Sequence, residues 1–300
     1  TAQNPQLYLP AVVFDGGGNN TEGLSQADVN GDGRQDIIGG GYWFEFIGNG
    51  SFTAHLIATG PFMRVAAGQL IPGGRPEIVQ IPGDASGVGR WFEWNGGAWI
   101  GHTLPIGQIE DGHSLDIADV DGDGHLDIFI GEMRYANSSN PEARTLLLWG
   151  DGQGDFTVET VATGFGHHES RLADLDGDGD FDILGKPFTW GTPRIDIWLN
   201  GAEGPACETP LSEWDTHIVD NARPNIAVFV RSADLNGDGL EDIISGAWWY
   251  RNPGSPGGAW QRNVIGAGLD QAALAVDFDD DGDIDILGTT WNGANPDQKH

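Results

Sequence analysis

One nine-residue pattern occurs five times in this chain of 300 residues. It reads Asp-x-Asp/Asn-x-Asp-Gly-x-x-Asp and spans residues 28–36, 119–127, 174–182, 234–242 and 277–285. Oxygen-bearing side chains stand at relative positions 1, 3, 5 and 9, and a glycine follows the third of them. Because Ca²⁺ takes about six to eight oxygen ligands and needs a sharply turning loop to gather them, the pattern predicts calcium loops.

Each loop contributes four predicted ligands. They are Asp28, Asn30, Asp32 and Asp36; Asp119, Asp121, Asp123 and Asp127; Asp174, Asp176, Asp178 and Asp182; Asp234, Asn236, Asp238 and Asp242; and Asp277, Asp279, Asp281 and Asp285. Acidic turns without metal are the alternative, but three or more acids within nine residues would repel one another without a cation. Asn30 and Asn236 each replace a carboxylate, so we expect weaker binding in those two loops.

The loops are not EF-hands. An EF-hand loop ends in a glutamate at position 12 and lies between helices. Here the last acid is at position 9, and short apolar segments such as residues 37–38 and 128–130 follow it directly. The loops therefore connect strands.

Each repeat has the same order of segments around its loop. An alternating apolar segment precedes the loop (residues 114–118), a second follows it, a third carries tryptophan (148–149), and a fourth follows a Gly/Asn turn (156–161). Four short strands in each ~40–60 residues, with glycine and aromatic residues at fixed places, are typical of propeller blades. The sequence predicts an all-β fold without helices.

A sixth unit lies between the first two loops. Residues 67–79 align with the other units and place Glu77 at the last ligand position, but the earlier acids are missing, so we expect no calcium there. The prediction is one domain, residues 1–300, with six four-stranded blades; seven blades are the second choice. The last unit is short of strands, and a strand at about residues 6–14 is expected to complete it, in the same molecule or in a neighbour.

These repeats resemble the FG-GAP/VCBS repeats of calcium-binding β-propellers, which occur in integrin α-subunits and in many secreted bacterial proteins. The resemblance covers nearly the whole chain and departs from the family pattern at the unit around Gly68. It implies that all calcium loops lie on one face of a disc, where they act structurally. The opposite face and the axial channel are then the usual binding surfaces.

Composition limits the partners and the cellular location. The net charge of −31 argues against nucleic acid and anionic membrane surfaces, and no apolar run approaches the ~18 residues of a transmembrane helix. The single cysteine, Cys207, excludes an internal disulfide. The absence of an initial Met and the calcium loops favour a secreted or cell-surface protein. Asn19, Asn49 and Asn137 begin sequons for N-glycosylation.

Polar residues are expected around the axis, six residues before each first ligand. They include His113, His168 and Gln271, with Met63 in the decayed unit and Glu22 and Val228 in others; their neighbours are Arg64, Asp111, His167, Glu169, Arg171, Arg231 and Asp270. A polar channel lining is the favoured interpretation. His113, His168 and Glu169 are weak catalytic candidates for a polysaccharide lyase or dehydratase. The net charge disfavours a uronate substrate unless a local basic patch exists.

Tryptophan suggests a further kind of site. Six tryptophans recur at one blade position and are expected to pack between blades: Trp43, Trp91, Trp94, Trp149, Trp198 and Trp248. Trp190, Trp260 and Trp291 fall outside that register and are candidates for stacking on sugar rings. The favoured function is a non-enzymatic structural or adhesion module that binds another protein or itself, with filaments as one form of self-assembly. Carbohydrate binding and propeller-type catalysis are the alternatives.

Overall fold

A computed structural model describes residues 23–49, 51–60, 62–134, 140–187, 194–201, 214–222, 227, 229–255, 257–266, 269–277 and 281–289. Within these ranges the chain forms strands and no helix, which confirms the predicted all-β class. No helix of the described residues is long and apolar enough to cross a membrane.

The strands form six antiparallel sheets in chain order. Sheet 1 holds β1 (Leu24–Ala27), β2 (Asp36–Gly39), β3 (Tyr42–Gly48) and β4 (Ser51–Leu56); sheet 2 holds β5 (Met63–Gly68), β6 (Glu77–Pro82), β7 (Ser86–Trp94) and β8 (Trp99–Glu110). Sheet 3 holds β9 (Ser114–Ala118), β10 (Asp127–Gly131), β11 (Arg144–Gly150) and β12 (Phe156–Thr163); sheet 4 holds β13 (Arg171–Ala173), β14 (Asp182–Gly185), β15 (Ile195–Leu199) and β16 (Asp215–Asp220). Sheet 5 holds β17 (Arg231–Ala233), β18 (Asp242–Ser245), β19 (Trp248–Arg251) and β20 (Gln261–Val264); sheet 6 holds β21 (Gln271–Val276) and β22 (Asp285–Thr289).

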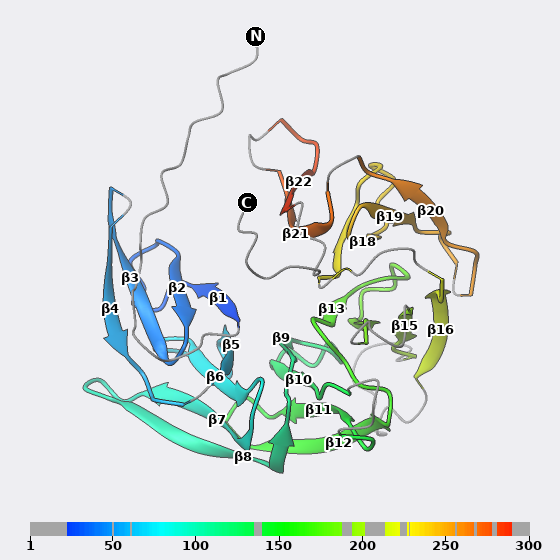
Figure 1. Cartoon of the computed structure of the whole chain (residues 1–300). Coiled ribbons are helices and arrows are strands. Elements are labelled where there is room, and N and C mark those ends of the chain that lie inside the picture. Colours follow the sequence, from blue (N-terminus) through cyan, green and yellow to red (C-terminus); the bar gives the residue numbers. More distant parts are fainter. Residues whose placement is uncertain are drawn as a thin grey trace.

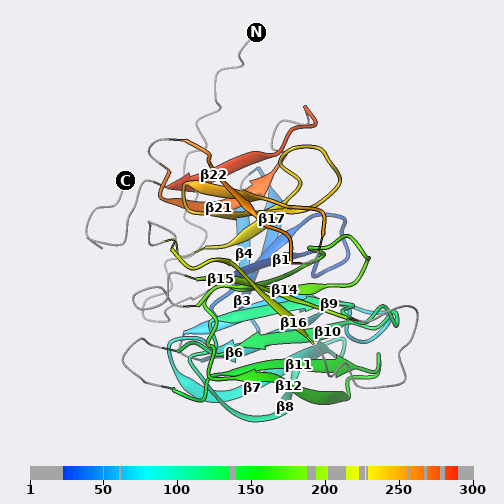
Figure 2. The ribbon, with the colours of Figure 1, turned by 90° about the vertical axis from the view of Figure 1, so that its right-hand side faces the viewer.

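The sheets stand around a common axis as the blades of a propeller (Figure 1). In the five four-stranded sheets, the first strand lies towards the centre and the fourth lies at the rim. Figure 2 shows the same sheets from the side, with β21 and β22 at one end of the view and β8 at the other. The β-propeller architecture is therefore as predicted.

The predicted number of blades is wrong. The described residues build five complete four-stranded blades, not six or seven, and sheet 6 has two strands. The loop at residues 277–285 does join β21 to β22, but a loop of this kind specifies only the hairpin that it connects. The strands expected to extend sheet 6, including the one predicted at about residues 6–14, lie outside the described residues, and so does the choice between closure within one molecule and closure by a neighbour.

The hydrophobic core lies between neighbouring sheets. Sheets 1 and 2 bury Trp43 and Ile78 against each other, sheets 2 and 3 bury Trp91, and sheets 3 and 4 bury Trp198. Sheets 4 and 5 share a cluster that includes Tyr250, which is 1% exposed. A sheet with an apolar face on each side must pack against two neighbours, which is why the blades follow one another around an axis.

All six inner hairpins have the same register. The residue at loop position 9 pairs with the residue that precedes position 1: Asp36 with Ala27, Glu77 with Gly68, Asp127 with Ala118, Asp182 with Ala173, Asp242 with Ala233, and Asp285 with Val276. The glycine at position 6 has a positive φ, as in Gly33 (84°), Gly124 (90°) and Gly179 (101°), a conformation that a Cβ would strain. Gly74 of the decayed unit has the same φ of 84°, so that unit is confirmed as a sixth copy of the hairpin.

Candidate functional site

The first acid of each loop organises the loop backbone. The carboxylate of Asp28 accepts N–H groups from Gly31 at 2.8 Å, Asp32 at 3.0 Å and Gly33 at 2.7 Å. Asp234 accepts the three equivalent N–H groups in sheet 5. Such hydrogen bonds fix the side chain in place, so its remaining lone pairs point in a defined direction.

The last acid is buried and ties the loop to the third strand of its sheet. Asp127 is 1% exposed and accepts N–H groups from Val120 at 2.9 Å and Gly150 at 2.8 Å. Asp36, Asp182 and Asp242 make the same pair of contacts in their own sheets. Burial raises the pKa of Asp127 and of Asp182 to about 7, because these N–H groups only partly replace the lost water. A bound cation would supply the missing compensation.

Two loops gather acidic oxygens closely enough for one ion. Ligand atoms of Asp119, Asp121 and Asp127 lie within 4.8 Å of one another, and so do those of Asp174, Asp176 and Asp182. These are positions 1, 3 and 9 of the predicted ligand sets. Three hard carboxylate oxygens, with room for carbonyl and water ligands, fit Ca²⁺.

The other predicted ligands are placed differently. Asp123 and Asp178, at position 5, lie outside these clusters and accept backbone N–H groups two residues ahead. In the loop at residues 28–36, Asp32 pairs with Arg34 at 2.5 Å, and the Asn30 amide donates to Glu45 at 3.0 Å. Asp279 lies outside the described residues, so the fifth loop is only partly described.

The decayed loop of sheet 2 has a side-chain amide at position 1, where the other loops have a carboxylate. Gln69 occupies position 1, and its amide Nε2 donates to the carbonyls of Ile71 at 2.5 Å and Gly73 at 3.0 Å. Glu77 is 4% exposed and accepts the Ile71 N–H at 3.0 Å. The positive end of an amide thus lies among loop carbonyls, while the last acid keeps its structural contact.

A pocket of 520 Å³ lies at the opposite end of the inner hairpins, on the axis. Its lining comes from the first residues of the inner strands and from the segments before them: Gly23, Leu24, Arg64, Val65, His113, Ser114, Leu115, Glu169, Ser170, Arg171, Phe229, Arg231, Ala273 and Leu274. His113, Glu169, Arg64, Arg171 and Arg231 are therefore brought together around the axial pocket. Met63 and Gln271 are buried and do not line it.

Charged groups link three sheets around the axial pocket. Glu169 is 6% exposed and forms an ion pair with Arg64, which also donates to His113 Nδ1 at 3.2 Å. The other ring nitrogen of His113 lies 2.6 Å from Asp84. Burial raises the pKa of Glu169, but Arg64, Arg171 and Arg231 more than offset this effect, and the pKa lies below its usual range. Burial and then Arg64 lower the pKa of His113, so this imidazole is neutral near pH 7.

The adjacent histidines have different surroundings. The His168 ring stacks on His113, with 4.8 Å between centroids. His167 is 2% exposed, and its ring nitrogens lie 2.7 Å from Thr145 Oγ1 and 3.0 Å from Ser170 Oγ. Burial lowers the pKa of His167 to about 3, so it is a neutral part of the core.

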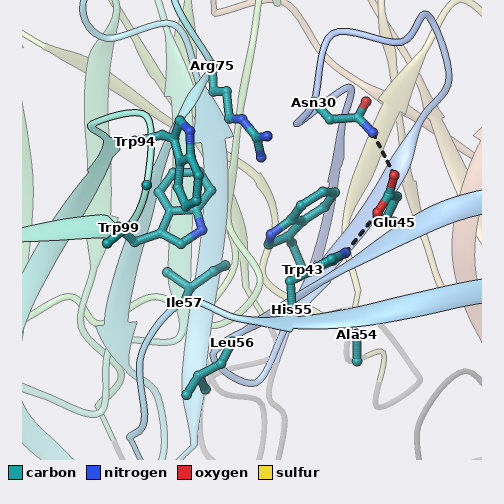
Figure 3. A pocket seen from close by; sticks show the side chains of 12 residues that line it. Asn30, Trp43, Glu45, Ala54, His55, Leu56, Ile57, Arg75, Trp94 and Trp99 are labelled. Atoms are coloured by element: carbon teal, nitrogen blue, oxygen red, sulfur yellow. Dashed lines mark hydrogen bonds and ion pairs between the residues drawn. The ribbon is translucent and has the colours of Figure 1, made fainter.

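A second cavity, of 740 Å³, opens between sheets 1 and 2 on the side of the calcium loops (Figure 3). We call it the aromatic groove; it is lined by Trp43, Trp94, Trp99, Arg75, Glu45, His55 and six further residues. The Arg75 guanidinium lies 4.5 Å from the Trp94 ring and 5.5 Å from the Trp43 ring, between the two walls. On the far wall Glu45 is 2.8 Å from His55, which stacks on Trp43.

The structure changes the roles expected of the tryptophans. Trp43, Trp91 and Trp198 are buried between sheets, as predicted. Trp260 is partly buried and packs against the core between sheets 4 and 5. Trp190 and Trp291 lie outside the described residues. Sequence reasoning missed Trp99, Asp84 and the role of Arg75, because the contacts that matter join different blades.

The chain is similar to known FG-GAP proteins. Residues 74–130 match the family model described as FG-GAP-like repeat. Integrin alpha-IIb of Mus musculus is 29% identical over 157 residues, and that of Homo sapiens is 28% identical over 157 residues; each alignment covers 46% of this chain and 15% or 14% of the relative. Phosphatidylinositol-glycan-specific phospholipase D of Rattus norvegicus is 25% identical over 189 residues, covering 55% of this chain and 21% of the relative.

Among solved structures, the V. cholerae biofilm matrix protein Bap1 aligns with a TM-score of 0.40 and 18% identity, over 87% of this chain and 33% of that one. This chain therefore corresponds to a small part of each of these proteins. The arrangement of the sheets and the repeated loops define the class of protein: a β-propeller. The match at residues 74–130 and the similarity to integrin alpha-IIb support FG-GAP-like repeats, as the sequence pattern predicted.

Proposed function

We propose that this propeller is an extracellular structural or adhesion module that is stabilised by calcium and acts without catalysis. The observation that carries the proposal is the gathering of three acidic oxygens at residues 119–127 and again at 174–182, in the loops of a chain that is similar in sequence to integrin alpha-IIb. Its partner would be another protein or a second copy of itself.

Calcium removal tests the structural part of this proposal. Ligands that bind only the folded state stabilise it by about 2.7 kcal/mol per site at a hundredfold excess over Kd. Excess chelator should therefore lower the Tm by at least about 5 °C, and calcium added back should restore it. A melting curve that chelator leaves unchanged would contradict structural calcium.

Sedimentation tests self-association. If a strand near residues 6–14 completes a neighbour's sheet 6, calcium should support polymers that pellet on centrifugation and dissolve in chelator. A monodisperse monomer at high protein concentration in calcium would contradict assembly and leave a propeller that binds other proteins.

Carbohydrate binding is the second candidate, because the aromatic groove offers indole rings beside a charged network. A glycan array in calcium buffer would test it, with Trp94→Ala as the variant and Trp260→Phe, outside the groove, as its control. Hits that Trp94→Ala removes and Trp260→Phe keeps would support sugar binding. An array without hits would contradict it.

A further inference from the structure

The axial pocket contains more positive charge than its own residues neutralise. The chain has 14 Lys and Arg against 45 Asp and Glu, yet three arginines line this one cavity. They are Arg64, Arg171 and Arg231, and within the described part of the chain Glu169 is the one acidic residue of the lining. These three arginines form a local basic patch in a chain whose net charge is strongly negative.

Glu169 is already shared by two of the three arginines. One carboxylate oxygen pairs with Arg64, and the other lies 3.6 Å from Arg171. The backbone of Glu169 has a φ of 62°, a left-handed conformation that costs energy in a residue with a side chain. The fold therefore holds this carboxylate in ion pairs with Arg64 and Arg171, while Arg231 interacts with its charge only at longer range.

Among the described residues, Arg231 donates hydrogen bonds only to neutral groups, and the charges of Asp116 and Glu169 act on it at longer range. Its Nε donates to the Ala273 carbonyl at 2.8 Å and its Nη1 to the Val230 carbonyl at 2.7 Å, while its guanidinium lies 5.3 Å from the Phe229 ring. Burial and then repulsion from Arg171 lower its pKa to about 10. Arg231 is partly buried and forms no ion pair among the described residues, although charged groups that lose water are usually paired. An anion in the pocket would supply that pair.

We propose that the axial pocket binds a small hydroxylated carboxylate of the sugar-acid class, held by Arg231 and Arg171. The planar fork of arginine matches a carboxylate with two parallel hydrogen bonds. Ser114 and Glu169 on the same lining offer partners for ligand hydroxyls, and Phe229 offers an apolar surface. A volume of 520 Å³ suits an organic ligand better than an inorganic ion, since ligand pockets measure about 300–1,000 Å³.

The site is separate from the calcium loops and from the aromatic groove. It lies at the opposite end of the inner hairpins, and none of its lining residues is a predicted calcium ligand. The inference therefore does not depend on the proposed adhesion function. The competing explanation is that Arg231 only braces β17 against β21 through the Ala273 carbonyl.

Calorimetric titration of the whole chain at constant calcium tests the proposal. The probes are D-glucuronate and D-galacturonate, with D-glucose and D-galactose as uncharged controls of the same size, and inorganic phosphate as a plain anion. We expect saturable binding of at least one sugar acid and none of the neutral sugars. Arg231→Gln and Arg171→Gln should each weaken that binding by about tenfold or more. Arg90→Gln, an exposed arginine of β7, should leave it unchanged.

Several results would overturn the assignment. Binding of none of the probes would do so, and so would phosphate binding as tightly as the sugar acids. N-acetylglutamate binding as tightly as the sugar acids would show a site for acidic peptides instead. Unchanged affinity in the arginine variants would leave Arg231 as a brace. If Arg231→Gln fails to fold, Arg171→Gln decides the question, because the Arg171 side chain is 31% exposed and only weakly paired.

Discussion

The two ends of the inner hairpins differ in how much they vary from sheet to sheet. At the loop end, the last acid accepts a loop N–H and a third-strand N–H in four sheets, with Asp127 as the example. At the axial end, the six inner strands contribute different residues to the pocket, among them Leu24, Arg64, Ser114, Arg171, Arg231 and Ala273. The loop end makes backbone contacts that recur from blade to blade. The residues at the axial end are not determined by the repeat, so they can differ between blades and form a binding site. The predictions below test this division, from the largest expected effect to the smallest.

The largest effect is expected for Asp127→Ala. The substitution leaves two buried N–H groups without an acceptor, at about 1–3 kcal/mol each, and removes a calcium ligand worth a further ~2.7 kcal/mol at high calcium. Glu77→Ala in the decayed loop is the matched control, since it loses a backbone contact and no metal. Denaturant unfolding with and without calcium should show a calcium-dependent loss only for Asp127→Ala. An equal calcium-dependent loss in both variants would contradict the assignment of metal to the loop at residues 119–127.

His167, behind the axial pocket, should make stability depend on pH. Its folded pKa of about 3 lies below the unfolded value near 6.5, so between these values the unfolded chain binds a proton that the folded chain does not. Stability should fall with falling pH in this window, by up to about 1.4 kcal/mol per unit. His167→Gln should show a shallower slope between pH 6.5 and 5 in parallel unfolding curves. An unchanged slope would mean that His167 can be protonated in the folded state.

Gln69→Ala should cost about 1 kcal/mol, because it removes a side-chain amide that donates to two carbonyls. The loss should be the same with calcium and with chelator. Asp119→Ala, at the same loop position in sheet 3, also loses the Gly124 N–H contact and should cost more stability in calcium than in chelator. If Gln69→Ala changed the response to calcium, the loop of sheet 2 would have to be counted among the metal sites.

The smallest effect is expected for Arg231→Gln in the absence of ligand. The substitution removes a partly buried charge that forms no ion pair among the described residues, and this offsets the loss of its hydrogen bonds, so the free energy of unfolding should change by less than about 1 kcal/mol. Thermal unfolding in a buffer without organic acids would measure it, with Arg90→Gln as the control. A loss as large as that of Asp127→Ala would show that the axial end is as structural as the loop end, and the division above would fail.

The repeated loop predicted most of the fold, because its signal is local. The hairpin register, the positive φ of Gly124 and the sixth hairpin at Glu77 all follow from nine residues read in order. The number of complete blades was predicted wrongly, since the same loop does not specify the outer strands of its sheet. Counting back from the first loop residue also placed His113 and the axial arginines near the axis. It did not show that Glu169 forms ion pairs with only two of these arginines.

Contacts between blades could not be predicted from the sequence. Arg75 comes from the decayed loop, Trp43 from the third strand of sheet 1 and Trp99 from the fourth strand of sheet 2, and they meet only because neighbouring sheets pack side by side. The spacing of residues along the chain specifies the partners within a blade. The angle and distance between two blades depend on the whole core between them, which no local pattern encodes.

Because of the Gln69 amide, the stability of the sheet 2 loop does not depend on dissolved ions. On the proposed binding of calcium to the other loops, its depletion would remove their ligand, while the Gln69 amide would stay in place in the loop of sheet 2. Amide hydrogens of β5 and β6 should therefore exchange slowly under depletion while those of β13 and β14 begin to exchange. Under calcium depletion the propeller should therefore open first at the sheets whose loops have no internal donor, and last at sheet 2.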